Sequence, residues 1–132
     1  MPRTKLPRPT DAELQILGVL WEQGPSTVRG VHSALETART VGYTTVLKLM
    51  QIMAEKGLVE RDETERAHVY RAAVAREQTQ RQLAGHLLQR AFGGSATKLM
   101  MQALASKKAS TEEIAQMREM LEQFEKRKET QR

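Results

Sequence analysis

A stripe of polar residues with the types that contact DNA bases lies on one predicted helix. Over residues 43–56, Thr44, Lys48 and Gln51 recur at spacings of four and three, so they share one helical face. Thr45 lies beside this stripe, near the start of the helix. Threonine contacts a thymine methyl or a base edge, lysine contacts guanine or phosphate, and glutamine suits adenine. The stripe therefore favours recognition of the DNA major groove, with an ordinary solvated helix face as the alternative.

Three helices are predicted up to and including this stripe. The first begins at Thr10, which lies three residues before Glu13, as in a capping box, and it ends at Gly24. Ser26 is expected to cap the second helix. The third helix, which carries the stripe, ends where Gly57 can adopt a left-handed backbone conformation.

A β-hairpin is predicted after the third helix. Residues 58–61 and 67–71 have the pattern of two short strands around a polar turn. Three helices followed by a hairpin are the plan of a winged helix-turn-helix. Contacts to DNA backbone phosphates are expected from the second helix and the hairpin, through Ser26, Arg61, Arg66, His68 and Arg71. Carboxylates in the same hairpin would limit its approach to DNA, and they belong to Glu60, Asp62, Glu63 and Glu65.

The rest of the chain is predicted to be helical. Apolar positions at helical spacing indicate one helix up to Phe92, a second after a cap at Ser95, and a third after a capping box at Ser110. Such narrow apolar stripes bury little surface alone, which favours packing against a second copy of the chain. The residues expected at this dimer interface are Leu83, Leu87, Leu88, Leu99, Ile114, Met117, Leu121 and Phe124.

The predicted fold class is mainly α with a small β-hairpin. A flexible basic arm is expected over residues 1–9, and a winged helix-turn-helix DNA-binding domain over 10–72. A three-helix dimerisation domain is expected over 73–132.

Composition restricts the chemistry that the chain can perform. The net charge of +5 favours an acidic partner, although residues 1–72 hold 10 Lys and Arg against 9 Asp and Glu. The absence of cysteine excludes disulfides and thiolate metal sites. No apolar run approaches the about 20 residues of a membrane span, so we expect no membrane insertion. His32, His68 and His86 are isolated from one another and from any catalytic motif, so we expect neither an enzyme nor a bound metal or cofactor.

Three stretches together resemble the penicillinase-repressor family, of the BlaI and MecI type: 10-TDAELQILGVLWEQGPSTVRGVHSAL-35, 43-YTTVLKLMQIMAEKGLVER-61 and 66-RAHVYR-71. The likeness continues through the Gly-Gly-Ser hinge into the last helix. It implies a cytoplasmic homodimer that occupies a palindromic DNA operator and blocks transcription, as repressors of antibiotic resistance do.

The resemblance also implies roles for individual residues. By position, Thr44, Thr45 and Lys48 would contact bases, with Gln51 nearby, while Tyr43 would orient the start of the helix. The positions implied for the wing are Arg66, His68 and Tyr70.

Release of repression is a further implication of the resemblance. In the β-lactam-responsive members, a membrane sensor-protease detects the antibiotic, and the repressor is cut in the helix after the hinge. The matching bond here lies near Gln102 and Ala103, where the Asn-Phe pair of those relatives is absent. The copper-responsive members bind metal through cysteines, which this chain lacks.

Two other functions fit the same sequence. One is a regulator controlled by a small molecule that binds between the C-terminal helices, in a pocket lined by Met100, Met101, Met117 and Met120. The other is a protein–protein adaptor that uses the winged fold without DNA, which the acidic hairpin would suit.

Overall fold

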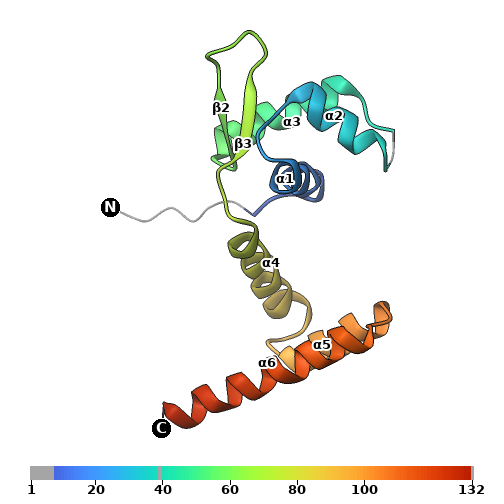
Figure 1. The fold of residues 1–132 in the computed structure, drawn as a ribbon, viewed down its shortest axis with the longest axis vertical. Helices are drawn as coiled ribbons and strands as arrows, with labels where there is room; N and C mark the ends of the chain where they lie inside the picture. Colours follow the sequence, from blue (N-terminus) through green and yellow to red (C-terminus); the bar gives the residue numbers. More distant parts are fainter. Residues whose placement is uncertain (1–7, 39, 132) are drawn as a thin grey trace. The chain divides into compact units, whose positions relative to one another are not determined.

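The computed structural model describes residues 8–38 and 40–131, in two compact units that divide after residue 85 (Figure 1). Most of the predicted basic arm lies outside the described residues. The elements in chain order are α1 (Asp11–Gln23), β1 (Ser26–Thr27), α2 (Val28–Glu36), α3 (Tyr43–Lys56), β2 (Val59–Asp62), β3 (Val69–Ala72), α4 (Arg76–Ala91), α5 (Ala96–Ser106) and α6 (Thr111–Thr130).

The predicted capping box at the start of α1 is confirmed. The Thr10 hydroxyl accepts from the Glu13 amide at 3.2 Å, and the Glu13 carboxylate accepts from the Thr10 amide at 2.9 Å. Two of the four amides that a helix leaves unpaired at its start are thereby satisfied within the chain.

The expected cap of α2 at Ser26 is wrong by one residue. Thr27 is the N-cap, and its hydroxyl accepts from the Gly30 amide at 3.1 Å. Ser26 instead pairs with Tyr70 of β3, and its own hydroxyl donates to the Gly24 carbonyl at 2.9 Å. Because strand pairing holds Ser26 in the sheet, the helix can start only after Thr27.

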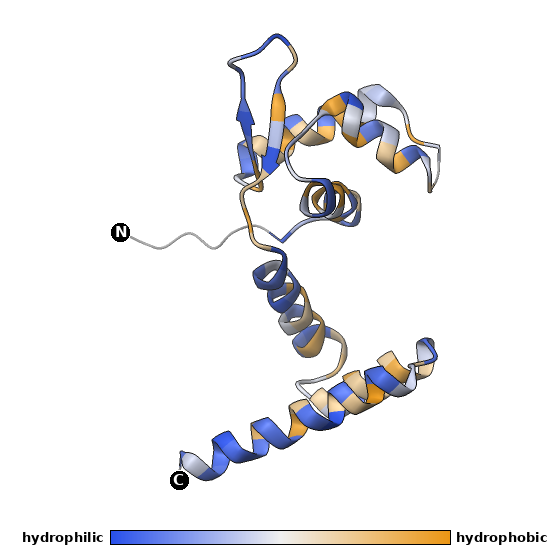
Figure 2. Cartoon of the chain, viewed as in Figure 1, coloured by the Kyte–Doolittle hydropathy of each residue, from blue (hydrophilic) through white to orange (hydrophobic). Residues whose placement is uncertain are grey.

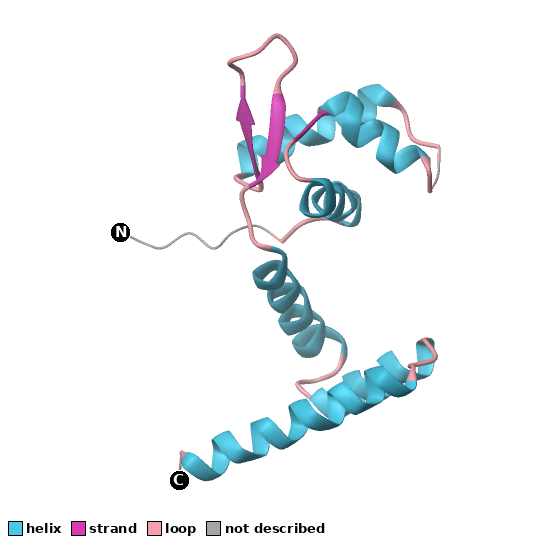
Figure 3. Cartoon of the chain, in the orientation of Figure 1, coloured by secondary structure: helices cyan, strands magenta, loops and turns pink. Residues whose placement is uncertain are grey.

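The sheet has three antiparallel strands in the order β1-β3-β2, one more than the predicted hairpin (Figure 3). Strands β2 and β3 form the hairpin, which we call the wing, and both begin later than the sequence pattern predicts. Strand β1 has only two residues, too few for an alternating pattern to reveal it.

The buried core of the first unit fixes the orientation of α3. Val46, Met50 and Met53 are fully buried on one side of this helix, against apolar residues of α1, α2 and the sheet. Burial stabilises each such side chain by about 1.5–3 kcal/mol relative to exposure. Rotating α3 to hide its polar stripe would expose these three residues, so the stripe must face outward.

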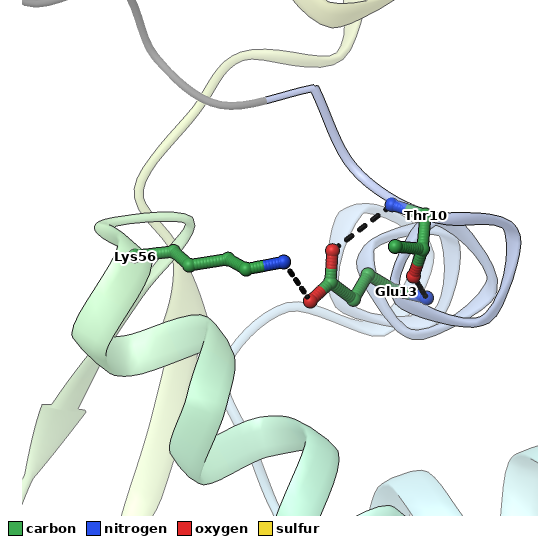
Figure 4. Close-up of polar contacts among 3 residues, drawn as sticks. All are labelled: Thr10, Glu13 and Lys56. Carbon is green, nitrogen blue, oxygen red and sulfur yellow. Dashed lines mark hydrogen bonds and ion pairs between the residues drawn. The ribbon is translucent and has the colours of Figure 1, made fainter.

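An ion pair joins the start of α1 to the end of α3, and both helices contribute to this core (Figure 4). Glu13, which is 1% exposed, accepts a hydrogen bond from the Lys56 ammonium at 2.7 Å. Burial alone would raise the pKa of Glu13, but the hydrogen bond from Lys56, together with the Thr10 amide, lowers it below its ordinary value. The carboxylate therefore stays charged near the N-terminus of α1, where the helix dipole favours it.

The predicted stop of α3 at Gly57 is confirmed. Gly57 has φ 86° and ψ 11°, a left-handed conformation that L side chains rarely adopt. Its amide donates to the Ala54 carbonyl, and the Leu58 amide donates to the Met53 carbonyl at 2.9 Å. This pair of bonds ends the helix and turns the chain directly into the wing.

The second unit is helical and has little interior of its own. The three predicted C-terminal helices are confirmed, with Ser95 and Ser110 as the N-caps of α5 and α6. No residue of α5 or α6 is buried, and apolar positions alternate with charged ones along α6 (Figure 2). Within the described residues, no helix is long and apolar enough to cross a membrane.

Candidate nucleic-acid interface

The predicted stripe on α3 is accessible along its whole length. Thr44, Thr45, Lys48 and Gln51 are all exposed, on the side of the helix away from the core. The hydroxyl, ammonium and amide groups are therefore free to meet an external partner.

The first turn of α3 is held by side chains of α2. The Nε2 atom of His32 lies 2.7 Å from the Val41 carbonyl, and because a carbonyl oxygen only accepts, Nε2 is the donor. The His32 ring meets the Tyr43 ring edge-on, with centroids 5.7 Å apart. The guanidinium of Arg29 lies 5.8 Å from the centroid of the same Tyr43 ring.

A groove of about 560 Å³ lies between α3 and the wing. Its lining brings together four predicted contact residues, Gln51, Arg61, Arg66 and His68. Arg29, which was not predicted, also lines it, and no carboxylate does. The groove is therefore a cationic surface that continues the polar stripe of α3.

The acidic residues of the wing lie mainly on its other face. Arg71 pairs across the strands with Glu60, and its Nε donates to the carboxylate at 2.9 Å. These two residues line a second hollow, of about 680 Å³, together with Asp62 and Glu63. Because side chains alternate between the faces of a strand, the buried Tyr70 points toward the groove while Arg71 points away from it.

Hydrogen bonds shift the pKa values of two charged side chains in the wing, Arg61 and Asp62. Hydrogen bonding to Tyr70, and then to Glu63 at 2.6 Å, raises the pKa of Arg61 above its ordinary value. The Thr64 amide donates to Asp62 at 2.9 Å and holds the pKa of that carboxyl below its ordinary value. Arg61 therefore carries a full positive charge in the groove, although Glu63 partly offsets it.

The structure separates the remaining predicted contact residues from this groove. Ser26 and Arg71 do not line it, and their proposed contacts to phosphates stay predictions. Arg29 was missed because nothing local marks it, since its place depends on how α2 packs against α3. Within the described residues, no group of three or more His, Asp and Glu side chains is placed to hold a metal.

The residues predicted to form the dimer interface are at least partly accessible. Leu87, Ile114, Leu121 and Phe124 are 43–52% exposed. Half-buried residues complete the predicted set, and they are Leu83, Leu88, Leu99 and Met117. Gln102 and Ala103, at the implied cleavage position, are exposed within α5.

Comparison with known proteins places this arrangement in a family. The sequence profile of the penicillinase repressor family matches residues 9–123, which is most of the chain. The chain belongs to the penicillinase repressor family. The predicted family resemblance is thereby confirmed.

Individual members of the penicillinase repressor family match to different extents. The transcriptional regulator BlaI of Mycobacterium tuberculosis is 40% identical over 75 residues, which cover 56% of this chain and 54% of the relative. The chain thus spans about half the length of these relatives in that match. The penicillinase repressor of Bacillus licheniformis is 23% identical over 124 residues, covering 94% of this chain and 97% of the relative.

A solved structure supports the fold assignment. The solution structure of the DNA-binding domain of the repressor BlaI covers 56% of this chain and 90% of that domain, with 23% identity and a TM-score of 0.50. With three helices, a three-stranded sheet and this likeness, the predicted fold class is confirmed as mainly α with a winged helix-turn-helix.

Proposed function

We propose that this chain is a DNA-binding transcriptional repressor without enzymatic activity. The observation that carries the proposal is the groove between α3 and the wing, which is cationic, free of carboxylates and continuous with an exposed polar stripe. A negatively charged duplex fits such a surface better than a basic or an apolar partner does. Membership of the penicillinase repressor family supports the same function.

In this proposal α3 enters the major groove of DNA. Thr44, Thr45, Lys48 and Gln51 contact base edges, because recognition helices present the residues of their first turns to the bases. Arg66 and His68 of the wing contact the flanking phosphates, which position the protein without specifying sequence. Ser26 and Arg71 are assigned weaker phosphate contacts outside this groove, which neither of them lines.

The proposed repressor acts as a homodimer formed by α4, α5 and α6. The exposed apolar residues of α4 and α6 have too little partner surface within one chain, and a second copy would cover them. Two winged domains would then occupy the two halves of a palindromic operator and exclude transcription from the promoter. Such a repressor works in the cytoplasm, with the DNA that it binds.

Release of repression is proposed to follow cleavage near Gln102 and Ala103, started by a membrane sensor-protease. These residues are exposed, so a protease can reach them after local unwinding of α5. The cut would detach α6 and with it half of the proposed dimer residues. Two linked half-site contacts gain from effective concentration, and separated monomers lose that gain.

A protein–protein adaptor is the second candidate function. It is favoured by the hollow on the outer face of the wing, where Glu60, Asp62 and Glu63 gather beside apolar residues. A small-molecule regulator is less well supported, because Met101 and Met120 are exposed rather than gathered around an interior pocket.

Fluorescence anisotropy tests the proposal. The purified protein is titrated with a labelled duplex from upstream of its own gene and with a scrambled duplex of the same length. We expect tighter binding to the upstream duplex, weakened by salt because counterions are released from the phosphates. Equal and weak binding to both duplexes would contradict the repressor and favour the adaptor.

A further inference from the structure

We propose that Arg29 contacts a DNA phosphate, and that Tyr43 and His32 are positioning residues that hold Arg29 and the start of α3 together. The inference rests on the proposed DNA-binding function and adds to it a contact outside the stripe and the wing. It gives a function to the contacts among Arg29, His32 and Tyr43, which do not belong to the buried core.

Arg29 has the surroundings of a phosphate-binding arginine. It is exposed in the first turn of α2 and lines the same groove as Gln51 and Arg66. Among the described residues no carboxylate pairs with Arg29, whereas Arg61, Arg71 and Arg76 each pair with a glutamate. An arginine without an acidic partner has all its donors available for phosphate oxygens.

The Tyr43 ring orders the Arg29 side chain. Their distance of 5.8 Å lies within the range of a cation–π contact. Stacking restricts the long side chain but leaves the N–H groups at the edge of the guanidinium free. The side chain of Arg29 therefore has less conformational entropy to lose when DNA binds, and its ordering costs less binding free energy.

His32 connects this pair to the turn before α3. Its ring supports the edge of the Tyr43 ring, and its Nε2 holds the Val41 carbonyl at 2.7 Å. The N-cap of α3, Gly42, has no side chain to fix the helix start. A continuous set of contacts therefore holds the Arg29 guanidinium in place relative to the polar stripe of α3. It runs from Val41 through His32 and Tyr43 to Arg29.

Salt-dependent anisotropy with the 132-residue chain tests the contact of Arg29. The probes are the upstream duplex and the scrambled duplex, each titrated at several salt concentrations. For Arg29→Ala we expect about tenfold weaker binding to both duplexes, and a salt dependence reduced by about one released ion per subunit. Arg76→Ala is the matched control, because Arg76 lies 5.8 Å from the Trp21 ring but does not line the groove.

A double-mutant cycle tests the positioning role of Tyr43. Tyr43→Phe keeps the ring and should bind as the wild type does, while Tyr43→Leu should weaken binding severalfold. If Tyr43 acts through Arg29, adding Arg29→Ala to Tyr43→Leu weakens binding little further. Full additivity of the two losses would overturn the positioning role.

Arg29→Lys should keep the salt dependence but lose affinity, because an ammonium stacks poorly.

The outcomes separate this inference from the proposed function. If the wild type binds DNA with the expected salt dependence but Arg29→Ala leaves affinity and salt dependence unchanged, only the inference fails. If the wild type binds neither duplex, the proposed function fails as well. Thermal unfolding of each variant identifies any loss of binding that comes from a loss of folded protein.

Discussion

At the scale of single residues, the clearest electrostatic feature is the buried carboxylate of Glu13. Lys56 and Thr10 satisfy it, so it ties the start of α1 to the end of α3. Both helices contribute to the core that turns the polar stripe outward. A change at this pair is therefore expected to affect the stability of the DNA-binding surface without touching it.

Glu13→Gln should lower the free energy of unfolding by about 1.5–3 kcal/mol at neutral pH, because a charge-assisted hydrogen bond is lost. The folded protein holds the pKa of Glu13 below its ordinary value. Its stabilising contribution is therefore present above about pH 4.3, the ordinary glutamate value, and is lost as the pH falls through the lower folded value. Urea unfolding at a series of pH values measures this, and Glu13→Gln should show a weaker dependence in that range.

A matched control for Glu13 lies in the same helix. Glu22 is exposed and pairs with Arg76 at 3.3 Å, so Glu22→Gln should change stability by less than about 1 kcal/mol. If both variants lose the same stability, burial of Glu13 is not the cause.

Lys48 is the residue of the stripe that best separates base contact from phosphate contact. If it contacts a base, Lys48→Ala should weaken binding to the upstream duplex by about 1–3 kcal/mol and affect the scrambled duplex much less. The measurement is anisotropy with both duplexes. An equal loss on both would reassign Lys48 to a phosphate.

At the scale of elements, the wing distributes its charges between two faces. Strand pairing places Arg71 opposite Glu60 and Arg61 opposite Tyr70. The alternation of side chains then sends Glu60 and Arg71 to the outer face, away from α3. The acidic residues of the hairpin therefore do not line the groove that we propose for DNA.

Removing one cation from each face of the wing tests this arrangement. Arg66→Ala should weaken DNA binding by about tenfold with a smaller salt dependence, because Arg66 lines the groove. Arg71→Ala should have less effect, because Glu60 already neutralises Arg71. A larger loss for Arg71→Ala would show that the outer face of the wing contacts DNA.

At the scale of the whole molecule, the two compact units differ in how they bury apolar surface. The first unit has a core of twelve buried apolar residues, from Ile16 to Val74. The helices α5 and α6 bury none, and they expose large apolar residues such as Phe124. The second unit therefore leaves apolar surface exposed within one chain, which the proposed homodimer would cover.

Leu121→Lys should convert the proposed homodimer to a monomer, because a charge would have to be buried against the second copy. Sedimentation at micromolar concentration measures the assembly, and operator affinity should fall by roughly 10²-fold. Gln123→Lys introduces the same charge on the same helix but outside the predicted stripe, and should leave the assembly unchanged. A wild-type monomer at this concentration would contradict the dimer.

The sequence by itself determined the helices of this protein, except for the exact start of α2. The bounds of α3, its stop at Gly57 and the capping box at Thr10 follow from local signals: apolar spacing, a glycine that accepts positive φ and a paired hydroxyl and carboxylate. The outward direction of the polar stripe follows from the same spacing. Such features depend on residues only a few positions apart, so a linear pattern contains them.

The tertiary structure alone decided which of these residues share a surface. The pairing of Ser26 with Tyr70 moved the cap of α2 to Thr27. The register of the wing placed Arg71 opposite Glu60, away from the groove that Arg66 and His68 line. The packing of α2 against α3 brought Arg29 to the groove. These outcomes depend on strand register and helix packing between distant segments, which no local spacing in the sequence specifies.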